Sequence, residues 1–210
     1  MKKIIFFTIF ILALFGREIA TGEVIVIVGG WSRTGTVEEI DRQLDPMKEA
    51  LEKIGHRVVV VRPTTYIPLS MASEEIYDEL KKENILGKDI IFIGWCWGGL
   101  ISRRFAEQYQ DIVNVKAIVQ IASPNKGYWF SPEFLFKTDA KKSKEIPLFV
   151  VAGNKSAKKW YLRSENDGTV DVASVLSAPS KEQVVFPLSH LELIASQEVA
   201  EKVITWIKNY

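Results

Sequence analysis

Unbroken apolar runs, each about the length of a single β-strand, recur along this chain and are separated by segments with helical spacing. Such runs are typical of strands covered on both faces, as in a parallel sheet with helices on each side. The alternation predicts an α/β fold, with a mostly parallel, doubly wound sheet of about six strands and helices on both faces. The predicted strands cover residues 23–30, 56–63, 88–94, 115–124, 146–154 and 182–188.

Local signals mark where several of the helices begin. Apolar residues at steps of three and four predict a helix over 37–54, with Asp45 as the cap of its main segment and Pro46 in the first turn of that segment. Ser73 is predicted to cap a second, polar helix, and a further helix follows the third strand. Ser196 is predicted to cap the last helix.

Composition narrows the classes of function. A length of 210 residues suits one domain with a sizeable core. The net charge is +1, so the chain has no basic field to hold a nucleic-acid backbone. A single cysteine excludes an internal disulfide and zinc sites built from several thiolates, and two histidines disfavour a poly-histidine metal site. We therefore expect neither a metal ion nor a nucleic-acid partner.

The N-terminal segment differs from the rest of the chain. Two lysines precede an apolar run from Ile4 to Phe15, and small residues follow at 20–22. The run is shorter than the roughly 20 residues of a membrane-spanning helix and matches the apolar part of a secretory signal. We expect residues 1–22 to be a signal peptide, residues 23–210 to be the mature domain, and the protein to be exported to the periplasm or the medium. An uncleaved anchor is the alternative.

The sequence Gly-Trp-Cys-Trp-Gly-Gly, at 94–99, contains the only cysteine of the chain, Cys96. A lone cysteine is most often a small buried hydrophobe. Here a predicted strand precedes it, a predicted helix follows it, and Gly94 and Gly98 flank the turn, while Trp95 is expected to point into the core. A nucleophile elbow requires this strand–turn–helix setting, and the start of a helix favours a thiolate. We therefore predict that Cys96 is a nucleophile.

A nucleophile of this kind needs a histidine base. In an elbow of this type the acid and then the histidine follow the nucleophile along the chain. His190 is the only histidine after Cys96, and it lies between the last predicted strand and the last predicted helix. His56 precedes a strand, which places it at the opposite end of the sheet, so His56 is predicted to be structural.

The segment 164–174, after the fifth predicted strand, supplies three acidic residues. Asp167 stands in an Asn-Asp-Gly turn sequence, which can fix a carboxylate at the tip of a loop. It is the predicted partner of the histidine, with Glu165 in reserve. Asp171 is predicted to begin or cap a short helix.

One long irregular segment, 125–146, is rich in aromatic residues and ends in a lysine-rich run. It is either a surface loop with its own hydrophobic cluster or a small lid over the carboxyl ends of the strands, where open α/β sheets bind ligands. The sequence leaves both interpretations open.

Taken together, these segments resemble the α/β-hydrolases, in particular the small bacterial lipases and esterases. The resemblance spans residues 23–208 and rests on the elbow and its helix, the loop after the fourth strand, the acid loop and the histidine loop. These segments are 94–109, 121–129, 165–177 and 187–194.

The resemblance implies cleavage of carboxylic esters or thioesters through a covalent acyl-enzyme, without a cofactor. Cys96 would be the nucleophile, His190 the base and then the acid, and Asp167 the residue that holds the imidazole. An oxyanion hole is also implied, formed by the backbone amides of Trp31 and Trp97. The implied partner is a small-molecule or lipid acyl substrate, with transient contact to a membrane surface left open.

The cysteine departs from the lipase pattern and leaves other functions open. Dienelactone hydrolases also carry cysteine at the elbow. A thiolate attacks thioesters readily and forms an acyl-enzyme that is easily transferred, which fits a thioesterase or an acyltransferase. The alternative of another class is a catalytically inactive binding protein that keeps the fold and the pocket.

Overall fold

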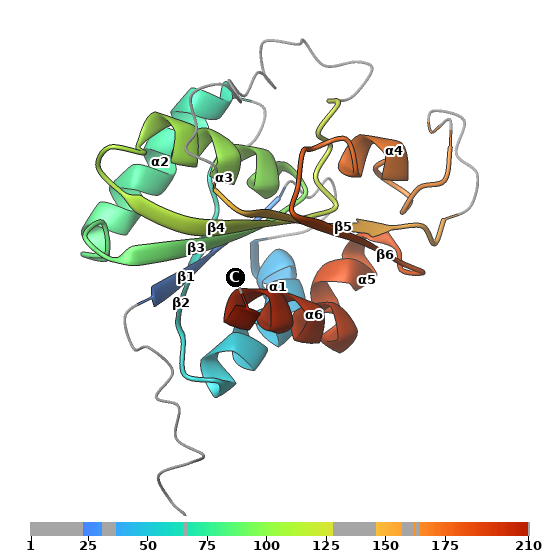
Figure 1. The fold of residues 1–210 in the computed structure, drawn as a ribbon, viewed down its shortest axis with the longest axis horizontal. Helices are drawn as coiled ribbons and strands as arrows, with labels where there is room; N and C mark the ends of the chain where they lie inside the picture. Colours follow the sequence, from blue (N-terminus) through green and yellow to red (C-terminus); the bar gives the residue numbers. More distant parts are fainter. Residues whose placement is uncertain are drawn as a thin grey trace, which may run out of the picture.

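In the computed structural model, six parallel strands form one sheet in the order β2-β1-β3-β4-β5-β6. The structure describes residues 23–30, 37–64, 67–127, 146–156, 162 and 164–209. Figure 1 shows the sheet edge-on, with its strands running through the middle of the molecule. The strands are β1 (Glu23–Val28), β2 (Arg57–Val61), β3 (Asp89–Trp95), β4 (Asn114–Ile121), β5 (Leu148–Gly153) and β6 (Glu182–Phe186).

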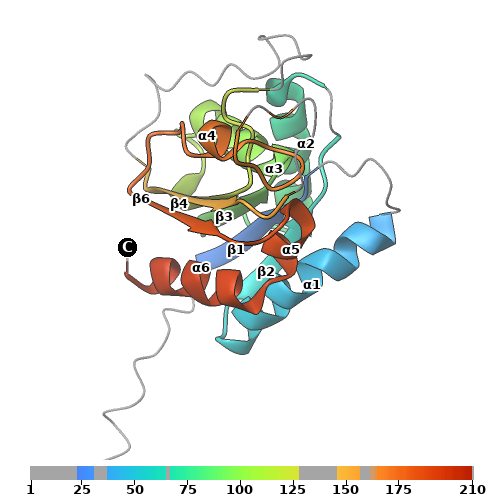
Figure 2. The ribbon, with the colours of Figure 1, turned by 90° about the vertical axis from the view of Figure 1, so that its right-hand side faces the viewer.

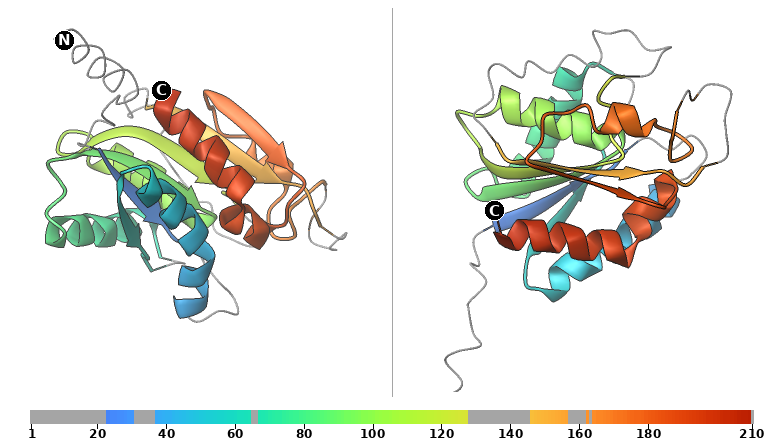
Figure 3. Two further views of the ribbon diagram at one scale, coloured as in Figure 1. Left: turned by 90° about the horizontal axis from the view of Figure 1, so that it is seen from below. Right: turned by 45° about the vertical axis from the view of Figure 1, so that its right-hand side comes forward.

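Helices cover both faces of this sheet. α2, α3 and α4 lie on one face and α1, α5 and α6 on the other (Figures 1 and 2), and the views in Figure 3 agree. The predicted fold class, a doubly wound α/β sheet of about six strands, is therefore confirmed. The helices are α1 (Val37–Lys53), α2 (Leu69–Lys82), α3 (Trp97–Gln108), α4 (Val172–Val175), α5 (His190–Ala195) and α6 (Gln197–Asn209).

The central strands are buried because they are apolar on both faces. In β3, every residue from Ile90 to Trp95 is buried, and β5 is buried along its whole length. Burial of a Val, Leu, Ile or Phe side chain contributes about 1.5–3 kcal/mol. The edge strands β2 and β6 are exposed or partly exposed except at their last residues, as expected where one side of a strand lacks a neighbour.

Two predicted helix starts are wrong. α1 continues from Val37 through Asp45 and Pro46 to Lys53, so Asp45 does not cap a helix. The helix tolerates the proline because Leu44 and Met47, on either side of it, are buried against the core, which outweighs one lost backbone hydrogen bond.

The second helix also begins earlier than predicted. α2 starts after Pro68, and Ser73 is a buried residue inside it. The Ser73 hydroxyl donates to the backbone carbonyl of Ser70 at 2.8 Å and contacts Gln108 Oε1 of α3 at 2.8 Å. Its polar group is therefore satisfied between two packed helices instead of at a helix end.

The order of the sheet reverses between β1 and β3. The chain goes from β1 outward to β2 and then returns to β3 on the other side of β1, and Val28 is in register with Gly94 where these two strands end. In open α/β sheets such a reversal leaves a crevice at the carboxyl ends of the strands, where ligands bind. Gly30 and Cys96 follow the two strands at this point.

Three predictions fall outside the described residues: the signal peptide at 1–22, the side chain and amide of Trp31, and most of the candidate lid, residues 128–145. Within the described part of the chain, no helix is both long and apolar enough to cross a membrane.

Candidate active site

Cys96 occupies a sharp turn between β3 and α3. Its backbone has φ 54° and ψ −120°, in the left-handed half of conformational space that residues other than glycine rarely adopt. Its backbone N–H donates to the carbonyl of Ile121 at 2.8 Å, which ties the turn to the end of β4. The residue is 3% exposed. Unusual backbone geometry of this kind is stored at functional sites when the surrounding structure holds it in place.

The glycines on either side of the cysteine permit this turn. A Cβ atom on Gly98 would overlap the carbonyl of Val28, and one on Gly94 would overlap the backbone of Gly99. The first turn of α3 therefore packs directly against the ends of β1 and β3. This close approach explains why glycine stands at both predicted elbow positions.

The end of β1 lies against the turn at Cys96. A Cβ atom added to Gly30 would come within 2.6 Å of the Cys96 Cβ and within 2.7 Å of the Trp95 carbonyl oxygen. The loop that begins at Gly30 therefore starts beside Cys96. Trp97, the first residue of α3, has a side chain only 2% exposed, so this tryptophan packs in the core.

Asp167 is 1% exposed, and hydrogen bonds from its own loop and from His190 hold it in place. Its Oδ1 accepts from the amides of Thr169 at 2.9 Å and Val170 at 2.7 Å. Its Oδ2 accepts from Nδ1 of His190 at 2.7 Å, and its backbone carbonyl accepts from the His190 amide at 2.9 Å. The loop turns at Gly168, whose φ is 98°. The Asn-Asp-Gly turn thus fixes the carboxylate against the histidine.

The other two acidic residues of this loop have different partners. Glu165 is exposed, and its carboxylate accepts from the Asn154 amide at 2.6 Å. Asp171 stands at the N-cap position of α4 but makes no capping bond with its side chain, which instead accepts from the Ser164 hydroxyl at 3.1 Å. Of the three candidates, Asp167 is the one that reaches His190.

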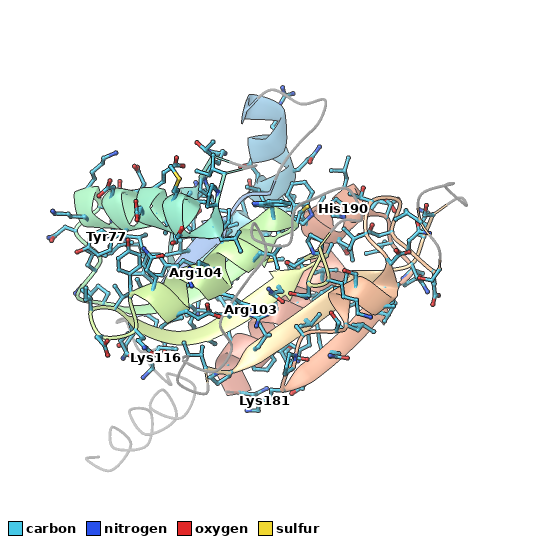
Figure 4. All side chains as sticks on the ribbon, turned by 90° about the horizontal axis from the view of Figure 1, so that it is seen from above. Tyr77, Arg103, Arg104, Lys116, Lys181 and His190 are labelled. Carbon is cyan, nitrogen blue, oxygen red and sulfur yellow. The ribbon has the colours of Figure 1, made fainter. Side chains whose placement is uncertain are left out.

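His190 is the first residue of α5, a short helix that was not predicted. Ser189 and Glu192 form a capping box: the Glu192 carboxylate accepts from the Ser189 amide at 2.8 Å and from its hydroxyl at 2.7 Å. Lys155 forms an ion pair with Glu192 at 2.7 Å. The Ser-x-x-Glu pattern at 189–192 was a signal for this helix in the sequence. Figure 4 labels His190 on the α5 ribbon.

The electrostatics of the site favour a charged imidazole. Burial lowers the pKa of His190, but the Cys96 sulfur and the Asp167 carboxylate oppose it, and the net effect raises this pKa to about 10. His190 is 6% exposed, and its Nε2 makes no hydrogen bond of standard geometry within the described residues. The Cys96 sulfur nonetheless acts on the imidazole, since it is the first of the causes that raise the His190 pKa.

His56 lies away from this group. It directly precedes β2, at the amino edge of the sheet, and burial lowers its pKa. The three residues Cys96, Asp167 and His190 all follow the carboxyl ends of strands. Among the described residues, no group of three or more His, Cys, Asp or Glu side chains is arranged to hold a metal ion.

Comparisons with known proteins agree with this architecture. The sequence matches no protein-family model, and a search of the curated proteins finds no match. Among solved structures, the mature lipase BlEst2 of Bacillus licheniformis is similar, with a TM-score of 0.66 and 14% identity over 90% of this chain and 92% of that one. The chain has the α/β-hydrolase fold.

Two further α/β-hydrolase-fold neighbours carry different names. A pyrethroid hydrolase from Sphingobium faniae JZ-2 has a TM-score of 0.62 and 13% identity, over 90% of this chain and 98% of that one. Tomato methylketone synthase I, solved with 2-tridecanone, has a TM-score of 0.60 and 9% identity, over 90% of this chain and 99% of that one. Since one fold supports several chemistries, the function must be argued from the site itself.

Proposed function

We propose that this protein is an acyl hydrolase that cleaves carboxylic esters or thioesters through a Cys96–His190–Asp167 triad. One observation carries the proposal: the buried Asp167–His190 pair, joined at 2.7 Å, lies beside a cysteine held in a strained strand-to-helix turn. The pair is more than the fold requires, because replacing a buried ion pair with apolar residues is often neutral or stabilising. This favours an enzyme over an inactive binding protein.

The proposed reaction begins with Cys96 as a thiolate and His190 as an imidazolium. The sulfur attacks the substrate carbonyl carbon, and the carbonyl oxygen becomes an oxyanion. Backbone amides of Trp97 and Trp31 donate to that oxyanion, each such bond contributing about 3–4 kcal/mol in the transition state. His190 gives its Nε2 proton to the leaving alkoxide or thiolate, and the carbon–leaving-group bond breaks. The product of this step is a thioester between Cys96 and the acyl group.

Water completes the cycle. Neutral His190 takes a proton from water at Nε2, the hydroxide attacks the thioester carbonyl, and the sulfur leaves as a thiolate. Asp167 keeps the imidazole in the tautomer that exposes Nε2 and stabilises its charged form in both steps. The raised pKa of His190 supports the charged starting state, because it keeps the imidazole protonated before the substrate is attacked.

The substrate class follows from the nucleophile and from the neighbours. The lipase and the pyrethroid hydrolase among the similar structures support carboxylic esters as substrates. The thiol supports a second candidate, thioesterase or acyltransferase activity, because its acyl-enzyme is itself a thioester that an amine or a thiol can cleave. We further propose that the protein is exported by residues 1–22 and meets its acyl substrate outside the cytoplasm.

The test is hydrolysis of a chain-length series of p-nitrophenyl esters and matched thioesters by the purified protein, with Cys96→Ala and Cys96→Ser alongside. Turnover that alanine abolishes would identify Cys96 as the nucleophile, and the preferred chain and leaving group would separate esterase from thioesterase. Equal inertness of the wild type and the alanine variant across the series would count against hydrolysis and favour a binding protein.

A further inference from the structure

Trp95, the residue directly before the nucleophile, contacts the histidine from the opposite half of the chain. Its indole Nε1 donates to the backbone carbonyl of His190 at 3.2 Å, across 95 residues of sequence. Trp95 is the last residue of β3 and is 1% exposed. A buried indole N–H normally requires a partner, and here the partner is the backbone of the proposed base.

The ring of Trp95 also faces the imidazole. The two ring centroids are 5.2 Å apart and the planes are tilted by 42°. A cation within about 6 Å of an indole centroid is attracted to the ring, and tryptophan is the best of the aromatic residues in this respect. The His190 imidazole lies within this distance of the Trp95 ring, so its charged form would be favoured by that ring.

The other bonds to His190 come from a different part of the fold. Its Nδ1 and its backbone N–H both bind Asp167, so these two bonds fix the histidine to the acid loop. Neither bond reaches the elbow. Trp95 does, because it is covalently attached to Cys96 and its indole is bonded to the His190 carbonyl.

We propose that Trp95 is a positioning residue, which aligns the His190 imidazole with the Cys96 sulfur through its indole N–H and supports the charged imidazole through its ring. The inference rests on the proposed Cys–His pair. It gives Trp95 a role in the site in addition to its packing in the core. The described titratable groups that act on the imidazole are Cys96 from the elbow and Asp167 from the acid loop.

Trp95→Phe is the informative variant, because it keeps an aromatic ring and removes the N–H. Trp206→Phe is the matched control. Trp206 also donates its indole N–H, to Glu182 at 2.6 Å, and stacks on Phe149 at 5.1 Å. Glu182 begins β6, at the amino edge of the sheet, so the control loses the same kind of bond at the edge opposite the site.

The readout is the rate of Cys96 alkylation by iodoacetamide between pH 5 and pH 10. In the wild type we expect rapid alkylation at pH 6, where an ordinary thiol is nearly inert. Trp95→Phe should slow the reaction at pH 6 by about fivefold or more, the scale of one lost hydrogen bond, and leave the rate at pH 10 within about twofold. Trp206→Phe should keep the wild-type profile at every pH.

Two results would overturn the inference. A Trp95→Phe profile equal to that of the wild type would show that the indole N–H does not position the base. Slow alkylation of the wild type itself at pH 6 would show that Cys96 and His190 do not form an activated pair, and it would overturn the proposed mechanism as well. A failure of the Trp95 inference alone can therefore be distinguished from a failure of the proposed function. If Trp95→Phe does not fold, benzothienylalanine at position 95 replaces the N–H with sulfur in a ring of nearly the same shape and serves in the same comparison.

Discussion

Asp167 and His190 are joined twice, once through their side chains and once through their backbones. Oδ2 of Asp167 accepts from Nδ1 of His190 at 2.7 Å, and the carbonyl of Asp167 accepts from the amide of His190 at 2.9 Å. The loop and the short helix are thus held together even without the carboxylate. The Asp167 side chain can therefore be replaced while the backbone bond still holds the loop against α5.

Asp167→Asn should leave the fold intact and lower turnover of the best ester by at least about 100-fold, because the amide no longer holds the imidazole in the required tautomer. Circular dichroism and kcat/KM measurements check both parts. Glu165→Gln is the control, since that exposed carboxylate binds Asn154 instead of the histidine. A loss of less than tenfold in Asp167→Asn would argue against the triad.

Glu192→Ala should lower the melting temperature at pH 7, and the difference from the wild type should disappear as the pH falls toward 2. Hydrogen bonds from Lys155 and from the amide and hydroxyl of Ser189 lower the pKa of Glu192 to about 2. A carboxylate with a depressed pKa stabilises the fold above its unfolded-state pKa of about 4.5, and this contribution is lost between about pH 4.5 and pH 2.

Thermal unfolding of the two proteins across that range checks the Glu192 prediction. Glu79→Ala, which removes a surface ion pair with Lys82, is the matched control and should show little dependence on pH. A difference between Glu192→Ala and the wild type that stays constant from pH 7 to pH 2 would contradict the role of the charged cap.

Gly98→Ala should destabilise the protein by several kcal/mol or prevent folding, because the new Cβ would overlap the backbone carbonyl of Val28. Urea unfolding, or the soluble yield if the variant does not fold, measures the effect. Gly87→Ala is the control, since a Cβ there meets no atom within 4 Å. Similar stability of the two variants would mean that α3 can move away from β1 at little cost.

The protein recovered from the periplasm or medium of a bacterial host should lack its first 22 residues, by intact mass. The charged start, the apolar run and the small residues at 20–22 motivate this expectation. If residues 1–22 are a secretory signal, replacing the lysines at positions 2 and 3 with glutamate should slow export, since such signals begin with positive charge. Recovery of the full-length chain from the membrane fraction would support an uncleaved anchor instead.

The sequence predicted the strands well and identified Asp167 as the carboxylate that contacts His190, because both depend on strong local signals. Runs such as Ile90–Ile93 admit few structures other than a buried strand, and the glycines around Cys96 mark a turn that other residues would obstruct. The helix starts were harder to predict. Pro46 is usually a helix start, but the burial of Leu44 and Met47 carries α1 through it.

Other features depend on contacts that no local pattern contains. Ser73 has the identity of a cap, yet its hydroxyl lies inside α2, where it contacts the Ser70 carbonyl and also Gln108 of α3, which lies far along the chain. The bond from Trp95 to the His190 carbonyl likewise joins two distant segments, so packing was the only role that the sequence supported for this tryptophan. By contrast, α5 had a local signal in its capping box, and its six residues were too few for helical periodicity to be recognised.

The separation of Trp95 and His190 by 95 residues has a consequence for biosynthesis. A growing chain emerges amino end first, so the cysteine leaves the ribosome well before the histidine does. If the proposed mechanism holds, the thiol has neither a base nor a charged partner until α5 docks beside the end of β3, and it should behave until then as an ordinary cysteine. An incomplete or unfolded copy would therefore not acylate itself from cellular thioesters, and a reactive sulfur would exist only in molecules that have finished folding.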